Sequence, residues 1–300
     1  MMRLQRIVIG MDFSGTAVDA AAWAARALPP TAALHLVHAI EPMGRPRFAL
    51  RALPSAEVVE RAARDFAERR LGELAASFTP RPVTTEIRVG KAAEVVLEVT
   101  RAMGADLVII GPHGERPRPT KLLGSTADRI VRQSPVPVLL ATNPGKSRPQ
   151  QLLVPVDDAD VTTHLLSYVH DLAAALDANV TLLHAWSNSL YSYVASMSHA
   201  TTKNEAQARA DIDKEMAAEG KRWLEELART GLPQDRVNAM VTYGDAGDAT
   251  LETADKIGAD LIVMGKQGSG LVAPALLGST VGTVLHGARC PVLVVTPARA

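Results

Sequence analysis

Short apolar runs alternate with longer amphipathic stretches along the whole chain. Runs such as 6–12, 106–111 and 291–296 are rich in Ile, Val and Leu without strict alternation, which is typical of strands buried on both faces of a parallel sheet. Stretches such as 59–74 instead place apolar residues at helical spacing. This alternation predicts an α/β fold with helices on both faces of a parallel sheet.

The same pattern occurs twice. The strands predicted in the first copy are 6–12, 33–40, 83–89, 106–111 and 137–141, and those in the second copy are 152–157, 179–185, 237–243, 260–265 and 291–296. We therefore predict two Rossmann-like domains, 1–145 and 150–300, each with a five-stranded parallel sheet and joined by the polar, Pro- and Gly-containing segment 143–150. The second copy is longer by an insertion at 187–204, which we interpret as a lid, a contact surface or an ordinary exposed loop.

Composition excludes several classes of function. Equal numbers of basic and acidic residues give a formal charge of zero, so there is no electrostatic footprint for nucleic acid. A single cysteine excludes an intramolecular disulfide and fits a reducing compartment. No apolar run is long enough for a membrane helix or a signal peptide. We expect a cytoplasmic protein that binds neither nucleic acid nor membrane.

A glycine pattern, which we call the glycine ladder, follows the fourth predicted strand of each copy with the spacing Gly-x2-Gly-x9-Gly-Ser-Thr. The first ladder is Gly111, Gly114, Gly124, Ser125 and Thr126, and the second is Gly265, Gly268, Gly278, Ser279 and Thr280. Glycines let backbone N–H groups approach an anion closely, and the start of a helix favours negative charge. The ladders therefore predict phosphate sites, although glycines that only shape turns and a serine that only caps a helix would give the same pattern.

An aspartate ends the first strand of each copy, Asp12 in one and Asp157 in the other. Because ligands of open α/β sheets bind at the carboxyl ends of strands, each carboxylate is expected near its ladder, where it can accept a hydrogen bond from an adenine amino group or a ribose hydroxyl. The alternative is a helix N-cap, a role that Ser14 or Thr16 could fill equally well. In the second copy Asp158 and Asp160 beside Asp157 would repel a polyphosphate, and we expect Lys266, the one nearby positive charge, to compensate.

These features together resemble the universal stress proteins in their tandem form. The matching pieces include both ladders, the strands that end in Asp12 and Asp157, and the segments around His38 and His184. The resemblance covers the whole chain and implies an adenine nucleotide alpha hydrolase-like fold that binds ATP, with or without magnesium. It implies that Asp12 with Ala39, and Asp157 with Ala185, hold adenine, while the ladders hold the phosphates.

The leading hypothesis is therefore an ATP-binding protein that acts in the stress response by regulation or signalling. No P-loop, general base or metal-ligand spacing accompanies the ladders, so we expect no catalytic residue and at most slow ATP hydrolysis. The alternatives are a tandem scaffold or adaptor that binds no nucleotide, and an enzyme that acts on an adenylated substrate. The apolar fifth strands predict association through sheet edges, either within the chain or in a homodimer, unless helices or loops cover them.

Overall fold

The computed structural model describes residues 4–42, 55–114, 123–145, 147–157, 161–186, 203–229, 231–266 and 277–296. The strands are β1 (Arg6–Gly10), β2 (Ala33–Ile40), β3 (Val83–Val89), β4 (Leu107–Ile110), β5 (Val138–Leu140), β6 (Gln151–Pro155), β7 (Asn179–Trp186), β8 (Val237–Tyr243), β9 (Leu261–Gly265) and β10 (Val292–Val295). The helices are α1 (Gly15–Ala27), α2 (Ala56–Ser77), α3 (Ala92–Met103), α4 (Ser125–Gln133), α5 (Val161–Leu176), α7 (Lys203–Arg229), α8 (Ala246–Ile257) and α9 (Ser279–Gly287), with a 3-10 turn at Gln234–Arg236.

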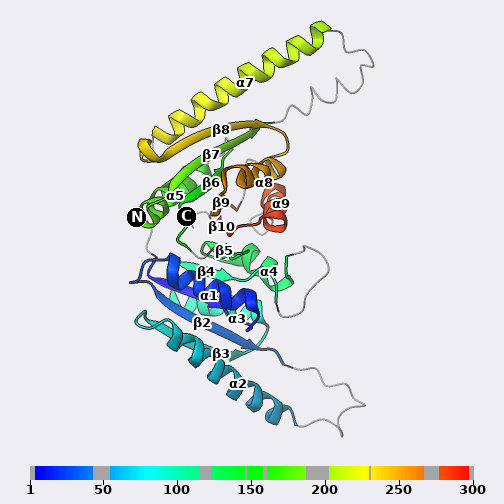
Figure 1. The fold of residues 1–300 in the computed structure, drawn as a ribbon. Coiled ribbons are helices and arrows are strands. Elements are labelled where there is room, and N and C mark those ends of the chain that lie inside the picture. The colour runs from blue at the N-terminus through cyan, green and yellow to red at the C-terminus, as the bar shows by residue number, and fades with distance from the viewer. Residues whose placement is uncertain are drawn as a thin grey trace, which may run out of the picture.

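The ten strands form one sheet in the order β3-β2-β1-β4-β5-β10-β9-β6-β7-β8 (Figure 1). Within the first half, β1–β5, and within the second half, β6–β10, all strand pairs are parallel. The predicted fold class is confirmed, and so is each predicted strand. The domain limits 1–145 and 150–300 stay a prediction. In each half the strand order reverses at the first strand, between β2 and β4 or between β7 and β9, and ligands of such sheets bind beside that point.

The two fifth strands pair with each other. β5 and β10 run antiparallel in the middle of the sheet, with Val138 opposite Val294 and Leu140 opposite Val292. The Thr296 hydroxyl adds a 3.2 Å hydrogen bond to the Val136 carbonyl of the first half. Of the predicted ways to satisfy these apolar edges, the structure therefore shows the one within the chain.

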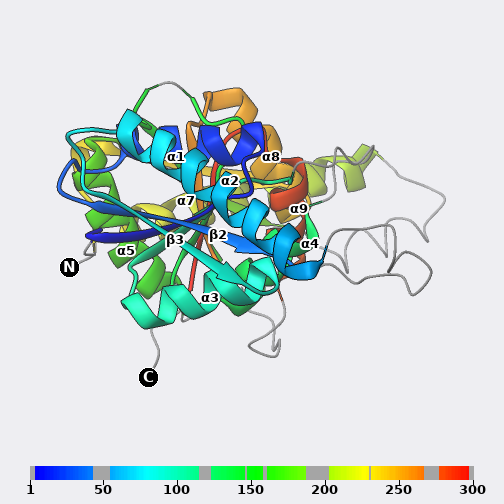
Figure 2. The ribbon, with the colours of Figure 1, turned by 90° about the horizontal axis from the view of Figure 1, so that it is seen from below.

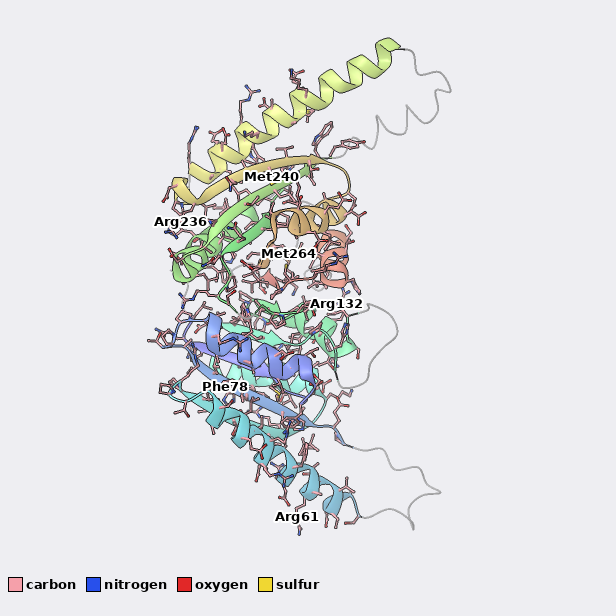
Figure 3. All side chains as sticks on the ribbon, in the orientation of Figure 1. Arg61, Phe78, Arg132, Arg236, Met240 and Met264 are labelled. Carbon is pink, nitrogen blue, oxygen red and sulfur yellow. The ribbon has the colours of Figure 1, made fainter. Side chains whose placement is uncertain are left out.

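Each face of the sheet carries one apolar core that runs through both halves. On β1, Ile7 and Ile9 pack in a cluster with residues of α1, α2, α5 and α7, while Val8 packs on the other face with α3, α4, α8 and α9. Figure 2 shows α3 across strands β2 and β3 from α1, and Figure 3 shows side chains filling the space between the sheet and both helix layers. Both clusters include residues of β5 and of β10, the pair of strands that joins the two halves and that we call the seam. The two halves therefore share their apolar cores.

The repeat extends to individual backbone conformations. Helices α3 and α8 each end at a glycine in the left-handed region, Gly104 with φ 55° and Gly258 with φ 63°. Such a residue closes the last turn of a helix, and glycine adopts it without strain. Equivalent stops 154 residues apart explain why the third helices have the same length of 12 residues.

Two further predictions concern the insertion in the second half and the absence of membrane helices. The insertion at 187–204 lies outside the described residues except for its last two, which begin α7. Within the described residues, the longest helices are too polar to cross a lipid bilayer.

Candidate functional site

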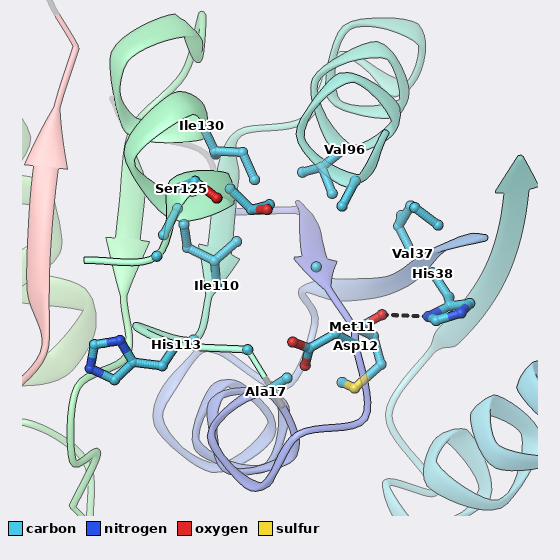
Figure 4. Close-up of a pocket in the computed structure, with 18 of the residues that line it drawn as sticks. Met11, Asp12, Ala17, Val37, His38, Val96, Ile110, His113, Ser125 and Ile130 are labelled. Carbon is cyan, nitrogen blue, oxygen red and sulfur yellow. Dashed lines mark hydrogen bonds between the residues drawn. The ribbon is translucent and has the colours of Figure 1, made fainter. Parts of the chain in front are cut away.

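A cavity of about 410 Å³ opens at the carboxyl ends of β1 and β4 in the first half (Figure 4). Its lining includes every residue that the sequence predicts for the first site: Asp12, Ala39, Gly111, Gly114, Gly124, Ser125 and Thr126. Val96 of α3, Ile110 of β4 and Ile130 of α4 form an apolar wall. One apolar wall with a few converging polar groups is typical of a small-molecule site.

Asp12 is held by the turn that leads into α1. Its Oδ1 accepts hydrogen bonds from the backbone N–H of Ser14 at 3.0 Å and from the Ser14 hydroxyl at 2.6 Å. Ser14 itself is the N-cap, because its hydroxyl accepts from the Ala17 N–H. The helix-cap alternative for Asp12 is therefore wrong, and its carboxylate is directed into the cavity (Figure 4).

The turn between Asp12 and Ser14 contains a strained residue. Phe13 has φ 65°, a conformation that bulky side chains rarely adopt and that costs about 1–2 kcal/mol. Its ring packs on His38, with ring centres 4.7 Å apart, and on Phe66 at 5.6 Å. His38 is anchored in turn, because its Nδ1 donates to the Met11 carbonyl at 2.7 Å. Aromatic packing thus holds the backbone turn that orients Asp12.

The first two glycines of the ladder lie close to other groups of the protein. A Cβ on Gly111 would lie 2.8 Å from the Thr16 hydroxyl and 3.2 Å from the Ala17 nitrogen. A Cβ on Gly114 would lie 2.9 Å from Asp12 Oδ2. The Thr16 hydroxyl also donates to the His113 carbonyl at 2.7 Å, which fixes the ladder against α1. Packing against the backbone of α1 therefore accounts for Gly111 without any ligand, whereas at Gly114 the close atom belongs to the side chain of Asp12.

Gly124 is different. It is the N-cap of α4 with an ordinary φ of −61°, and no side chain caps the helix there. A Cβ at this position would meet the Pro112 carbonyl at 3.4 Å, which is ordinary van der Waals contact. Neither the backbone conformation nor packing against the described residues requires a glycine here, yet Gly124, Ser125 and Thr126 line the cavity with the first N–H groups of the helix.

Charge in the described lining is negative. Besides Asp12 it contains Glu41, whose Oε1 accepts from the Ala92 N–H at 3.2 Å at the start of α3. The sequence reasoning missed Glu41, although it lies only two residues beyond Ala39 at the end of the same strand. The described lining includes no lysine or arginine, and the basic residues Arg116, Arg118 and Lys121 lie outside the described residues.

The second half repeats much of this arrangement. Asp157 follows β6, Ala185 lies near the end of β7, Gly265 ends β9, and Gly278, Ser279 and Thr280 begin α9. Gly278 is again an N-cap without a side-chain cap, with φ −60°. His184 donates from Nδ1 to the Val156 carbonyl at 3.1 Å, as His38 does to Met11. Gly268 lies outside the described residues, so the second ladder is described only in part.

Lys266 does not serve the second site as the sequence suggests. It is only 4% exposed, and its ammonium donates a hydrogen bond to the Arg132 carbonyl in the last turn of α4, in the other half of the chain. Burial, and then the charge of Arg132, lower the pKa of Lys266. The expectation that it compensates phosphate charge is wrong, because its ammonium is already committed across the seam.

No metal centre emerges in the described part of the chain, where no three His, Cys, Asp or Glu side chains converge. The lone Cys290 is partly buried, and burial followed by Asp260 raises the pKa of its thiol to about 12. It therefore has the character of a packing residue.

Comparison with known proteins gives consistent matches. The model of the universal stress protein family matches the chain twice, over residues 3–142 and 149–296. Universal stress protein MT2698 of Mycobacterium tuberculosis (strain CDC 1551 / Oshkosh) is 27% identical over 298 residues, covering 96% of this chain and 95% of the relative. A universal stress protein of Mycolicibacterium smegmatis is 25% identical over 300 residues, covering 97% of each.

Solved structures agree on the fold. A universal stress protein from Archaeoglobus fulgidus superposes with a TM-score of 0.67 at 18% identity, covering 99% of this chain and 98% of that chain. The functionally unknown protein PA1789 from Pseudomonas aeruginosa gives a TM-score of 0.60 at 20% identity, covering 99% and 94%. At such identities these two similarities establish the architecture only.

Proposed function

The chain belongs to the universal stress protein family, and we propose that it binds ATP and acts in the stress response by nucleotide-dependent regulation or signalling. The proposal assigns adenine to Asp12 and Ala39 and the phosphates to Gly111, Gly114 and Gly124–Thr126. It assigns the equivalent groups of the second half, Asp157, Ala185, Gly265, Gly268 and Gly278–Thr280, to a second site, and it ranks neither site above the other.

The missing side chains of Gly124 and Gly278 carry the proposal. Among the described residues, the nearest atom to a Cβ on Gly124 lies 3.4 Å away, and the nearest to one on Gly278 lies 4.0 Å away. Both residues have φ values that any residue adopts. What a side chain would obstruct at these positions is an anion that approaches the uncapped N–H groups of α4 and α9. A ligand therefore accounts for these two glycines where packing among the described residues does not.

The cavity also fits a magnesium complex of the nucleotide. Its volume of about 410 Å³ lies in the ordinary range for small-molecule sites. Asp12 and Glu41 would repel a bare triphosphate, and Mg²⁺ takes oxygen ligands from carboxylates and phosphates together. With Asp12 assigned to adenine, the phosphate oxygens would hold the ion, and when bound the ion would offset the repulsion between these carboxylates and the triphosphate.

The test is ATP affinity of the full chain, measured by isothermal titration calorimetry with and without Mg²⁺. The double variant Gly124→Ala/Gly278→Ala is expected to lose at least about tenfold in affinity, roughly 1.4 kcal/mol, while its melting temperature without nucleotide stays close to that of the wild type. Gly72→Ala in α2, where a Cβ meets no described residue within 4 Å, is the matched control and should bind normally. Removal of Mg²⁺ with a chelator should weaken binding.

Absence of ATP binding in the wild type would overturn the proposal and leave the scaffold or adaptor. Within the proposal we assign no catalytic residue and no more than slow hydrolysis. We place the protein in the cytoplasm, in keeping with its single cysteine. A homodimer through sheet edges would use β3 or β8, because β5 and β10 pair with each other.

A further inference from the structure

Lys266 joins the two halves at a point that matters for both candidate sites. It follows Gly265, the first glycine of the second ladder, and its backbone N–H donates to the Val295 carbonyl at 2.9 Å, so its main chain is fixed to β10. Its side chain leaves the second half and its ammonium reaches the Arg132 carbonyl of α4. A buried residue beside one ladder thus contacts a helix of the other half.

The carbonyl that it reaches belongs to the last turn of α4. The last four carbonyls of a helix have no partner within the helix, and positive charge is favourable there. The Ser134 N–H uses the Ile130 carbonyl at 2.8 Å, while Lys266 takes that of Arg132. At 4% exposure the side chain has little freedom to leave. The contact is therefore a fixed link between Gly265 and the C-terminus of α4.

The opposite end of α4 lines the first cavity. The helix has nine residues, a length of about 13 Å, and begins at Gly124, Ser125 and Thr126. A helix this short moves as a rigid body, so a shift of its C-terminus is carried to the N–H groups at the first site. Lys266 thus connects the second ladder to the phosphate end of the first site through one rigid element.

The link has no counterpart in the reverse direction. The position equivalent to Lys266 is Pro112 and the one equivalent to Arg132 is His286, each 154 residues apart. Proline has neither a side-chain donor nor a backbone N–H. The two halves are therefore similar in fold but unequal at the seam, and duplication alone does not explain Lys266.

We propose that Lys266 couples the two nucleotide sites, so that occupancy at the Gly265 ladder changes affinity at the Gly124 site through the position of α4. This inference rests on the proposed function, since it requires both sites to bind ATP. By linkage the coupling is reciprocal, and the affinity at the second site changes by the same factor when the first is filled.

The experiment is a thermodynamic cycle measured by calorimetry with ATP and Mg²⁺. Gly278→Ala weakens the second site and leaves the dissociation constant of the first, and Gly124→Ala does the reverse. Multiplying these two dissociation constants gives the value expected for independent sites. The coupling factor is this value divided by the product of the two stepwise dissociation constants of the wild-type chain. We expect it to differ from 1 by about fivefold or more, and to return close to 1 in the Lys266→Met background.

Met replaces the ammonium by an apolar end on a side chain of similar length, so it removes the hydrogen bond to the Arg132 carbonyl and keeps most of the packing of the stem. Lys266→Gln, whose donor is one atom shorter, takes its place if that variant does not fold. Lys256→Met, at an exposed lysine of α8, is the control and should leave the factor unchanged. The coupling would be overturned, while ATP binding stands, by any of three results: the same coupling factor in the wild type and Lys266→Met, a coupling factor of 1 in the wild type, or binding at one site only. No binding at all would overturn both.

Discussion

Gly111→Ala is expected to destabilise the folded chain in the absence of any nucleotide. The new Cβ would lie 2.8 Å from the Thr16 hydroxyl and 3.2 Å from both the Ala17 nitrogen and the Thr16 carbonyl carbon. The last two are backbone atoms in the first turn of α1, so no side-chain rotation relieves them. Either the end of β4 moves away from α1 or the first turn of α1 shifts.

The magnitude follows from two contributions. Overpacking of a filled core costs about 1–3 kcal/mol. Displacement of Thr16 also breaks its 2.7 Å hydrogen bond to the His113 carbonyl, which contributes about 0.5–1.5 kcal/mol. We therefore expect Gly111→Ala to lower the free energy of unfolding by about 2–4 kcal/mol. Gly124→Ala, with its nearest contact at 3.4 Å, should change it by less than about 0.5 kcal/mol or raise it slightly.

The assay is urea denaturation of the two variants and the wild type, followed by tryptophan fluorescence. Trp23 of α1 is only 2% exposed and reports on the packing of the helix against which Gly111 lies. The slope with urea should stay constant while the midpoint falls for Gly111→Ala. Equal stability of both variants, or a larger loss in Gly124→Ala, would refute the division of the ladder into packing glycines and a ligand glycine.

Two further predictions test packing and reactivity elsewhere. Gly247→Ala should lower the free energy of unfolding by about 1–3 kcal/mol, because its Cβ would lie 2.6 Å from Thr283 Cβ, a stiff β-branched side chain. Gly282→Ala in the facing helix α9, where a Cβ would meet no atom within 4 Å in the described part of the chain, should raise it by up to about 1 kcal/mol. Equal midpoints in urea for the two variants would contradict both expectations. With its pKa raised from 9.0 to about 12, the Cys290 thiol should be alkylated by iodoacetamide about 1000-fold more slowly at pH 8 in the native than in the unfolded chain. Its rate should rise as the pH approaches the raised pKa, and native labelling within tenfold of unfolded labelling would exclude the shift.

The sequence predicts the strands, and which residues line the first cavity, because both follow from local patterns. Apolar runs bounded by glycine or aspartate define β1 and β4, and the rule that ligands lie at carboxyl ends of parallel strands brings Asp12 beside Gly114. The structure confirms that neighbourhood, with Asp12 Oδ2 2.9 Å from a Cβ built on Gly114. Because the chain is a duplication, the same pattern predicts the strands of the second half.

The sequence does not predict which single side chains contact the other half across the seam. Lys266 stands beside the second ladder in sequence, but its partner Arg132 is 134 residues away and becomes a neighbour only through the antiparallel pairing of β5 with β10. Nor could the motif separate its own glycines. Gly111 and Gly124 are both glycines of one motif. Only the distances from a Cβ at each position show that packing excludes a side chain at Gly111 and leaves room for one at Gly124 among the described residues.

The β5–β10 pairing has a consequence for any attempt to study one half alone. Cutting the chain in the segment 143–150 would leave an apolar, fully buried strand, β5 or β10, as the bare border of each fragment. Uncapped borders of this kind recruit other chains and promote aggregation. Because both halves belong to one polypeptide, β5 and β10 pair intramolecularly, at an effective concentration in the millimolar range. Each half therefore protects the edge strand of the other from pairing with other chains.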